Sequence, residues 1–181
     1  TVWALRELPR RLLVLGGGPI GCELAQAFAR FGAQVTLLQR GARLLPREDA
    51  DVSGLVMQRF RAEGIELRLG HQARAFVTEG GDKVLIAAHA GETVRIAFDT
   101  LLLALGRSAN LSGYGLEALG VRCGQTIETN ALLQTNYPSI YAAGDVAGPY
   151  QFTHVAAHQA WYAAVNALFD QMPEDTVMCL T

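Results

Sequence analysis

Apolar runs and glycine-rich turns at the start of the chain follow the order of a strand, a helix and another strand. Residues Arg11–Leu15 form a short apolar run that ends in a cluster of glycines, which is typical of a buried parallel strand. A helix is predicted from Pro19 to Phe31, because proline suits a first helical turn and Gly32 follows the last periodic residue. Gln34–Gln39 predicts the next strand. This order predicts a right-handed βαβ unit with a parallel sheet.

Hydrophobic patterns in the middle of the chain indicate further helices and strands that belong to the same domain. Apolar residues recur at helical spacing from Asp49 to Glu63, and Ile65–Leu69 predicts a further strand. The run Leu101–Leu105 predicts a last, buried strand. Between them lie short β-like runs joined by glycines, which favour an antiparallel meander over another helix: Ala73–Glu79, Lys83–Ala88 and Val94–Phe98. Together these elements indicate an α/β, Rossmann-like, three-layer domain with a β-meander.

After this domain the sequence no longer has long periodic segments, because frequent glycines divide it into short ones. We place a domain boundary near residues 107–110. Ser139–Ala143 predicts a further strand, and Thr153–Phe169 predicts a long helix. Because that helix has apolar residues on nearly all sides, we expect it to be buried.

Composition and charge mainly exclude classes of function. The net charge of −2 gives no broad electrostatic surface for nucleic acid or an anionic membrane, so neither is an expected partner. No apolar run reaches the ~18 residues of a membrane span. Residues 1–10 lack the apolar stretch of a signal peptide, so a cytoplasmic protein is expected. The first residue is Thr1, which is typical of either an excised segment or a processed terminus.

Cysteine and histidine spacing gives no metal or disulfide pattern. The three cysteines share no close spacing, which argues against a disulfide framework and a paired-cysteine zinc site: Cys22, Cys123 and Cys179. His154 and His158 lie four apart on a predicted helix, a spacing that can bind a metal ion. Because no further ligands accompany them, we predict no metal site and expect them to pack or to form hydrogen bonds.

Three glycines between the first strand and the first helix form the pattern G-x-G-x-x-G. Gly16 makes the tight turn, Gly18 lets the backbone approach a pyrophosphate, and Gly21 lets the helix pack against the strand. The phosphates would lie on the free N–H groups at the helix N-terminus, where Pro19 and Ile20 also line the turn. The strand before and the helix after this turn support a dinucleotide-binding site.

The end of the second strand determines which nicotinamide cofactor fits. An acidic residue there would accept hydrogen bonds from the adenosine ribose and repel a 2′-phosphate. This chain has the neutral Gln39 followed by Arg40, with Arg43 nearby. Either guanidinium could pair with a 2′-phosphate, which favours NADP over NAD. The alternative is that these arginines are only solvated surface residues.

Gly144 and Asp145 follow the strand predicted at Ser139–Ala143. Ligands of α/β sheets bind at the carboxyl ends of strands, where glycine permits close approach and a carboxylate accepts from ligand hydroxyls. The alternative is an aspartate that only caps the next turn.

These two motifs, with the run Leu101–Arg107 between them, resemble the class I pyridine nucleotide–disulfide oxidoreductases, which include glutathione reductase, dihydrolipoamide dehydrogenase and mercuric reductase. The resemblance runs from Arg11 to Phe169. It implies that Asp145 binds the ribityl chain of FAD beside Gly144. It also implies that the helix N-terminus at Phe152 and Thr153 faces the flavin pyrimidine ring, where its dipole favours the reduced anion.

The same resemblance implies roles around the nicotinamide. Glu23 matches a glutamate of the family that lies near the nicotinamide and flavin rings, so we expect it to orient the nicotinamide. Gly106 matches a glycine beside the nicotinamide nucleotide. Pro19 stands where some relatives carry a tyrosine lid, so an aromatic gate is not expected. Ala109 replaces the proline of the family's G-R-x-P-N pattern, a change that we expect to affect only the stiffness of the loop.

Several parts of the family's machinery have no match in this sequence. These are the C-x-x-x-x-C redox pair, the acid–base His-Glu pair and the glycine motif for the FAD pyrophosphate. The resemblance therefore implies a NAD(P)-binding domain at 1–108, the returning segment of a discontinuous FAD-binding domain at 109–170, and a linker toward an interface domain at 171–181. We expect no catalytic residue in this chain, no turnover by it alone, and a homodimeric full-length protein.

Three functions follow. The leading hypothesis is an oxidoreductase in which NAD(P)H reduces FAD, and electrons pass to a disulfide or a metal ion. The alternatives are a flavoprotein of the same fold with a quinone, oxygen or a ferredoxin-like acceptor, or a nucleotide-binding module without catalysis.

Overall fold

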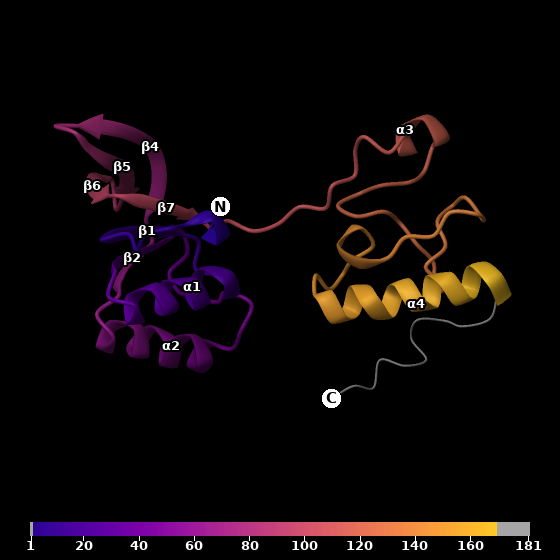
Figure 1. The fold of residues 1–181 in the computed structure, drawn as a ribbon, viewed down its shortest axis with the longest axis horizontal. Coiled ribbons are helices and arrows are strands. Elements are labelled where there is room, and N and C mark those ends of the chain that lie inside the picture. The colour runs from indigo at the N-terminus through magenta and orange to yellow at the C-terminus, as the bar shows by residue number, and fades with distance from the viewer. Residues whose placement is uncertain (1, 170–181) are drawn as a thin grey trace. The chain divides into compact units, whose positions relative to one another are not determined.

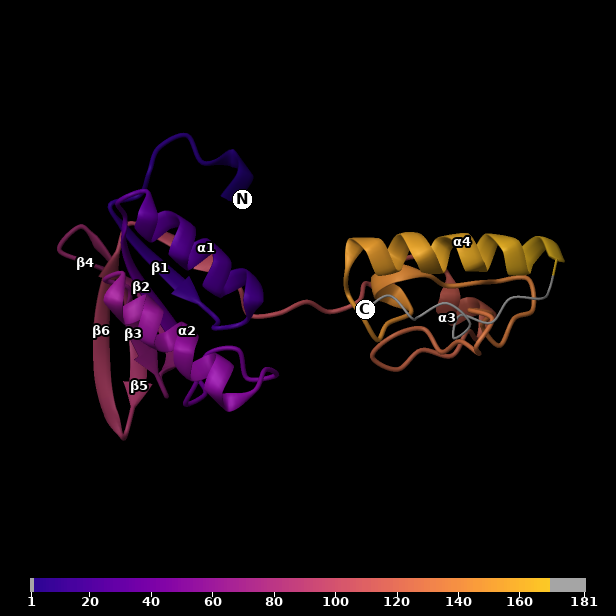
Figure 2. The same ribbon diagram turned by 90° about the horizontal axis from the view of Figure 1, so that it is seen from below.

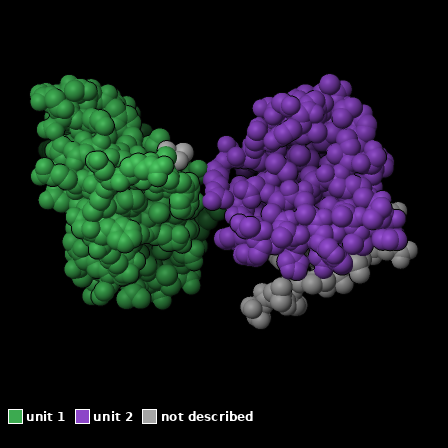
Figure 3. All heavy atoms as spheres, viewed as in Figure 1, with its two compact units in different colours: residues 1–106 green, residues 107–181 purple. Residues whose placement is uncertain are grey.

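The computed structural model describes residues 2–169 of the chain. The chain divides into two compact units, Thr1–Gly106 and Arg107–Thr181, which Figure 3 colours separately. The segment 171–181, for which the sequence predicts a linker, lies outside the described residues, and so does Cys179.

Unit 1 is built on a parallel sheet of four strands in the order β3-β2-β1-β7. The strands are β1 Arg11–Leu15, β2 Gln34–Gln39, β3 Glu66–Leu69 and β7 Thr100–Leu103. Helix α1 (Pro19–Arg30) connects β1 to β2, and α2 (Ala50–Ala62) precedes β3. A short 3-10 helix, η1 (Val2–Ala4), lies before the sheet. The predicted βαβ start is confirmed, with element ends within a residue or two of those expected.

The two faces of the parallel sheet carry different layers, which explains why β1 is apolar at successive positions. Leu12 and Val14 belong to the core beneath α1 and α2, together with residues such as Phe60. Leu13 and Leu15 belong to a second core on the opposite face. Because successive side chains of a strand point to opposite faces, a strand covered on both sides must be apolar throughout.

The second layer is an antiparallel meander, β4 (Gln72–Glu79), β5 (Asp82–His89) and β6 (Glu92–Phe98). Its side chains Leu85 and Phe98 pack into the second core. Figures 1 and 2 show the helices α1 and α2 on one side of the parallel sheet and the meander on the other. The three-layer, Rossmann-like α/β domain with a β-meander is therefore confirmed.

Strand β7 corrects one expectation about burial. The sequence predicts a buried strand over Leu101–Leu105, but the strand ends at Leu103, and the side chains of Leu103 and Leu105 are 63% and 73% exposed. The reason is its position: β7 pairs only with β1 and forms the edge of the sheet.

Unit 2 contains little regular structure among its described residues. It has α3 (Leu116–Leu119), the 3-10 helix η2 (Gly144–Val146) and α4 (Thr153–Phe169). The strand predicted at Ser139–Ala143 is wrong. This segment folds back on residues 133–135 through a single isolated bridge, Gln134 with Tyr141, and no strand within residues 2–169 extends the pairing.

Helix α4 has the predicted bounds but not the predicted burial. Val155, Tyr162 and Ala163 are buried, whereas Trp161 and Leu168 are 54% and 76% exposed. One face of α4 therefore packs against the rest of unit 2, and the apolar residues on its other faces are exposed. Across residues 2–169, no helix has both the length and the apolar character needed to cross a membrane.

Candidate functional site

The glycine turn brings the end of β1, the start of α1 and the end of β7 into close contact. The backbone of Gly16 has a φ of 109°, and a Cβ at this position would collide with the carbonyl oxygen of Ala104. A Cβ at Gly21 would collide with the carbonyl oxygen of Gly16. Both positions therefore require glycine, because any side chain would force the strand and helix apart.

Gly18 differs from the other two glycines of the motif. It is the N-cap of α1 with extended backbone, φ −79°, which any residue can adopt. A Cβ on Gly18 would meet no protein atom within 4 Å. Neither strain nor packing in the protein requires glycine here, so the space beside Gly18 is left open at a helix N-terminus. An open cradle of backbone N–H groups at this point fits a pyrophosphate.

The peptide of Gly17, in the middle of the turn, is held from three directions. Its N–H donates to the side-chain oxygen of Gln39 at 3.2 Å, and its carbonyl oxygen accepts from the backbone N–H of Leu45 at 2.7 Å. The Cys22 thiol also donates to that carbonyl, at 3.5 Å. The turn is therefore a preorganised structure rather than a loose loop.

Cys22 is part of this structure and not a reactive thiol. Burial and, to a lesser extent, the charge of Glu23 raise the pKa of the Cys22 thiol to about 11. A thiol with this pKa is protonated at neutral pH, whereas nucleophilic cysteines need a thiolate.

The residues predicted to select the cofactor lie at the end of β2, but they behave differently from one another. The carboxamide oxygen of Gln39 is turned to Gly17. Arg43 donates from Nη2 to the carbonyl oxygen of Pro46 at 2.9 Å. Arg40 is exposed and has no hydrogen bond or ion pair to any described residue. Of the two predicted phosphate-binding arginines, Arg40 is thus the one whose whole guanidinium is available.

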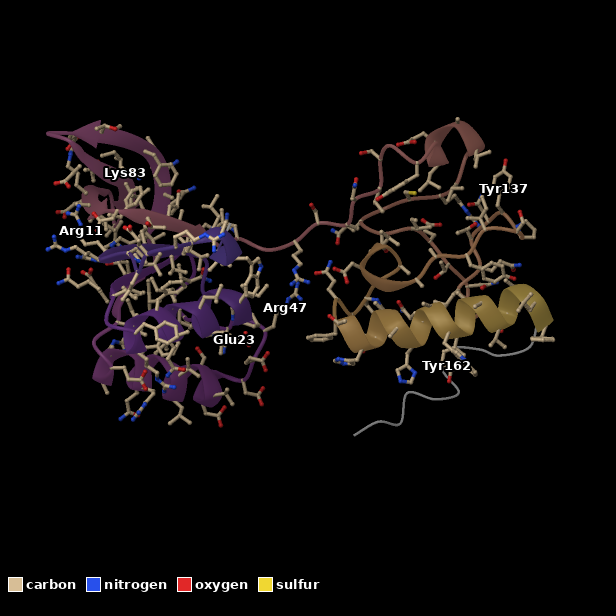
Figure 4. The ribbon with its side chains drawn as sticks, in the orientation of Figure 1. Arg11, Glu23, Arg47, Lys83, Tyr137 and Tyr162 are labelled. Carbon is tan, nitrogen blue, oxygen red and sulfur yellow. The ribbon has the colours of Figure 1, made fainter. Side chains whose placement is uncertain are left out.

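The residues predicted around the nicotinamide lie at the same end of unit 1. Glu23 is exposed on α1, and Figure 4 shows it on the opposite side of unit 1 from Arg11 and Lys83. Pro19 and Ile20 begin the helix, and the Ile20 side chain is 43% exposed. Gly106 is exposed with a φ of 118°, a conformation that favours glycine. These groups leave apolar surface beside the turn, together with the Glu23 carboxylate, which pairs with no described residue.

In unit 2, Gly144 and Asp145 lie in η2 and not at the end of a strand. The φ of Gly144 is 77°, and a Cβ there would lie 3.2 Å from the Cβ of Ala156 on α4. Asp145 is partly exposed, with its Oδ2 3.7 Å from Nη1 of Arg107. The alternative role for Asp145, in which it only caps the next turn, has no hydrogen bond to support it among the described residues.

Sequence reasoning missed Gln159, which holds this loop in place. Gln159 is 1% exposed on α4; its Oε1 accepts from the Gly144 N–H at 2.7 Å and its Nε2 donates to the Gly148 carbonyl at 3.0 Å. A lone glutamine among apolar helix positions was the available signal, since a buried carboxamide must find partners.

Helix α4 begins at Thr153, directly after Phe152, and both residues are exposed. The Phe152 ring stacks on the His154 ring, with centroids 5.4 Å apart. Within residues 2–169, no group of three or more histidine, cysteine or acidic side chains could hold a metal ion. His154 and His158 are exposed, and each lies beside an aromatic ring.

A parallel sheet with a glycine turn between its first strand and first helix, open at Gly18, defines a dinucleotide-binding protein of the Rossmann-like class. The family model described as "Pyridine nucleotide-disulphide oxidoreductase" matches residues 1–160. The chain belongs to this family, whose members are FAD- and NAD(P)H-dependent oxidoreductases.

Individual relatives agree with this assignment. The chain is 38% identical over 176 residues to a dihydrolipoyl dehydrogenase of Thermus scotoductus, and the alignment covers 92% of this chain and 38% of that protein. It is 42% identical over 164 residues to a mercuric reductase of Acidithiobacillus ferrooxidans, and that alignment covers 90% of this chain and 29% of the reductase. Its fold is similar to that of the HOCl-induced flavoprotein disulfide reductase RclA from Escherichia coli, with a TM-score of 0.86, 30% identity, and coverage of 96% of this chain and 40% of RclA. The chain thus spans well under half the length of each.

Proposed function

We propose that residues 1–108 are the nicotinamide dinucleotide-binding domain of an FAD-dependent oxidoreductase. The observation that carries the proposal is the open space at Gly18, flanked by two glycines that the protein's own packing requires. A motif that served only to pack strand against helix would need Gly16 and Gly21 but would tolerate a side chain between them. The open space at the middle glycine of the motif is explained by a ligand that approaches the backbone there.

When bound, NAD(P)H supplies a hydride, FAD accepts it, and the electrons go on to a disulfide or a metal ion. The names of the relatives, dihydrolipoyl dehydrogenase and mercuric reductase, support these two acceptor classes. The acceptor site belongs to a part of the enzyme outside the residues described. Within this chain, the role of Glu23 is to orient the nicotinamide, since its free carboxylate can accept hydrogen bonds from the carboxamide. Pro19, Ile20 and Gly106 form the surface around it.

The cofactor we propose is NADP(H) rather than NAD(H). Strand β2 ends without a carboxylate, and Arg40 is exposed and unpaired among the described residues. A free guanidinium matches the bidentate geometry of a phosphate. Arg43 retains donors besides the one bound to Pro46 and is the second candidate for the 2′-phosphate.

Residues 109–170 are proposed to be the returning segment of the FAD-binding domain. Asp145 would accept from the ribityl hydroxyls, with Gly144 as the close backbone contact. The exposed N-terminus of α4 at Phe152 and Thr153 would face the flavin ring, where the helix dipole favours added negative charge. We expect the full-length enzyme to be a homodimer.

The test is a calorimetric titration of the purified chain with NADPH and with NADH, together with two arginine variants. We expect binding of both, tighter for NADPH. Arg40→Ala should weaken NADPH binding about tenfold and leave NADH binding unchanged, because it removes only the 2′-phosphate contact. Arg61→Ala is the matched control, because Arg61 is an exposed arginine on α2 without an ion pair to any described residue. A folded sample that binds neither nucleotide would refute the proposal.

A further inference from the structure

Two histidine rings are stacked at the carboxyl end of β3. His71 follows β3 after a single glycine, and His89 is the last residue of β5. The register that pairs Gln72 with Ala88 puts these two histidines opposite each other at the next position. Their ring centroids are 4.0 Å apart, and their planes differ by 6°.

The stack is held rigidly by the backbone around it. Nδ1 of His71 lies 2.7 Å from the carbonyl oxygen of Leu69, and Nδ1 of His89 lies 3.2 Å from that of Gly70. Because a carbonyl only accepts, each Nδ1 carries the hydrogen and donates it. The turn after His89 has consecutive positive φ values, 51° at Ala90 and 86° at Gly91, as in a tight two-residue hairpin. The ring of His89 therefore has a fixed position.

Only one face of this stack is available to a ligand. His71 is 6% exposed, whereas His89 is exposed. Since the inner face of the His89 ring covers His71, the exposed part of His89 is its outer face and edge. The stack presents a flat aromatic surface to solvent.

Backbone hydrogen bonds tie this surface to the segment that follows β2. The N–H of His71 donates to the carbonyl oxygen of Gln39 at 3.1 Å, and the N–H of Gly70 donates to that of Gly41 at 3.0 Å. Gln39 in turn binds Gly17 in the glycine turn. Across the sheet, the end of β1 carries the glycine turn, the end of β2 carries Gln39 and Arg40, and the end of β3 carries the histidines.

We propose that the outer face of His89 is the stacking platform for the adenine ring of the bound dinucleotide. This inference rests on the proposed function. Neighbouring strands lie about 4.8 Å apart, so the ends of β1 and β3 are separated by about 10 Å, a distance that the ribose and base of an adenosine can bridge. Dinucleotides lie across the carboxyl ends of such strands, and a flat aromatic face binds any base through its π surface.

One experiment compares His89→Ala with His89→Phe, measured by calorimetry with NADPH, NADH, adenosine monophosphate and nicotinamide mononucleotide. The alanine variant should weaken the three adenine ligands about tenfold and leave nicotinamide mononucleotide unchanged. The phenylalanine variant should keep wild-type affinities, since it retains the ring. His158→Ala, which removes an exposed histidine of α4, is the control and should change none of them.

The outcomes separate this inference from its alternatives. If His89→Phe weakened NADPH alone, His89 would be a partner of the 2′-phosphate and the platform would be refuted. Unchanged adenine binding in a folded alanine variant would also refute it. If wild-type protein bound NADPH but His89→Ala had no effect, the proposed function would stand without the platform; if wild type bound no dinucleotide, both would fall.

A second readout needs no variant. The chain has four histidines, two in each unit, and their ring protons can be followed by nuclear magnetic resonance as adenosine monophosphate is added. A stacked base should shift the His89 ring signals upfield, with a smaller shift for His71. His154 and His158 should stay in place. Equal shifts at all four, or none at His89, would overturn the assignment.

Discussion

The side-chain oxygen of Gln39 accepts a hydrogen bond of 3.2 Å from the backbone N–H of Gly17. This contact joins the end of β2, where we propose that the cofactor is selected, to the turn that we propose as the pyrophosphate site. In this proposal, Gln39 both holds the shape of the turn and sets the charge of the ribose site. The two roles can be separated by substitution.

Gln39→Glu should reverse the cofactor preference. Glutamate keeps an acceptor for the Gly17 N–H, but its negative charge repels a 2′-phosphate and suits a ribose hydroxyl. We expect NADPH binding to weaken about tenfold or more relative to NADH binding. Gln39→Ala is the control: it removes the hydrogen bond without adding charge, so both cofactors should weaken alike. Calorimetry of the two variants decides, and a parallel loss of both cofactors in Gln39→Glu would contradict the charge argument.

Gly18→Ala should separate binding from folding. A methyl group at Gly18 meets no protein atom within 4 Å, so the free energy of unfolding should change by less than about 1 kcal/mol. Binding of NADPH should fall sharply, because the methyl group occupies the phosphate cradle. Gly16→Ala should instead destabilise the domain by at least about 2 kcal/mol, because its side chain would collide with the backbone at Ala104.

Gly54→Ala is the matched control for these variants. Gly54 lies within α2, and a Cβ there also meets nothing within 4 Å. Alanine in a helix interior should raise the free energy of unfolding by about 0.5–1 kcal/mol and leave binding unchanged. Thermal unfolding and calorimetry of all the glycine variants test the set. Normal NADPH affinity in Gly18→Ala would show that the open space holds no ligand.

The features that depend on local residue patterns could be predicted from the sequence. Successive apolar residues in β1 predicted a strand covered on both faces, and the glycine spacing predicted which backbones approach each other. Both follow from periodicity and from the absence of a Cβ, which are visible without the fold. The three-layer unit 1 was predictable for this reason.

The features that could not be predicted from the sequence depend on contacts between residues that are distant along the chain. Ser139–Ala143 has strand composition, but a strand also needs a neighbour, and this segment finds only a single bridge. The direction of the Gln39 carboxamide and the burial of Gln159 depend on where other backbones leave a donor or acceptor unpaired. The stacking of His71 on His89 depends on the register of a hairpin. Such relationships are set by tertiary packing and not by residue type.

The ion pairs of Glu63 should make the stability of unit 1 depend on pH. It joins α2 to α1, with Oε1 2.8 Å from Nη2 of Arg30 and 2.6 Å from Nε of Arg59, and it also accepts from Gln26. The hydrogen bond from Arg30 is the main cause that lowers the pKa of Glu63 to about 2, from an ordinary value of 4.5. A lowered pKa in the folded state means that its stabilising contribution is complete above pH 4.5 and is lost as the pH falls toward 2.

Glu63→Gln should therefore lower the midpoint of thermal unfolding at pH 7, and its difference from wild type should shrink between pH 4.5 and 2. Added salt at pH 7 should also reduce the difference, because the charges are near the surface. Glu48→Gln is the control, since Glu48 is exposed and has no ion pair to any described residue. A difference that did not change with pH would assign the effect to packing.

Gln159 should control the stability of the loop that presents Asp145. Its carboxamide binds the Gly144 N–H at one end of this loop and the Gly148 carbonyl at the other. Gln159→Leu would leave both groups buried without this partner, at a cost of about 1–3 kcal/mol for each unsatisfied group. Gln159→Glu keeps the acceptor for Gly144 but loses the donor to Gly148 and buries a carboxylate beside that carbonyl oxygen, so at pH 7 it should be at least as destabilising as Gln159→Leu. The chain has two tryptophans, Trp3 and Trp161, and Trp161 lies on α4, so fluorescence in a Trp3→Phe background reports on the unfolding of unit 2.

Gln159→Leu should lower the midpoint of the unfolding transition seen by Trp161 fluorescence. The midpoint of the transition seen by circular dichroism, which reports on the β-rich unit 1, should stay unchanged. A Trp161 transition unchanged by Gln159→Leu would show that the loop is held by contacts other than this carboxamide, and that Asp145 is positioned without it.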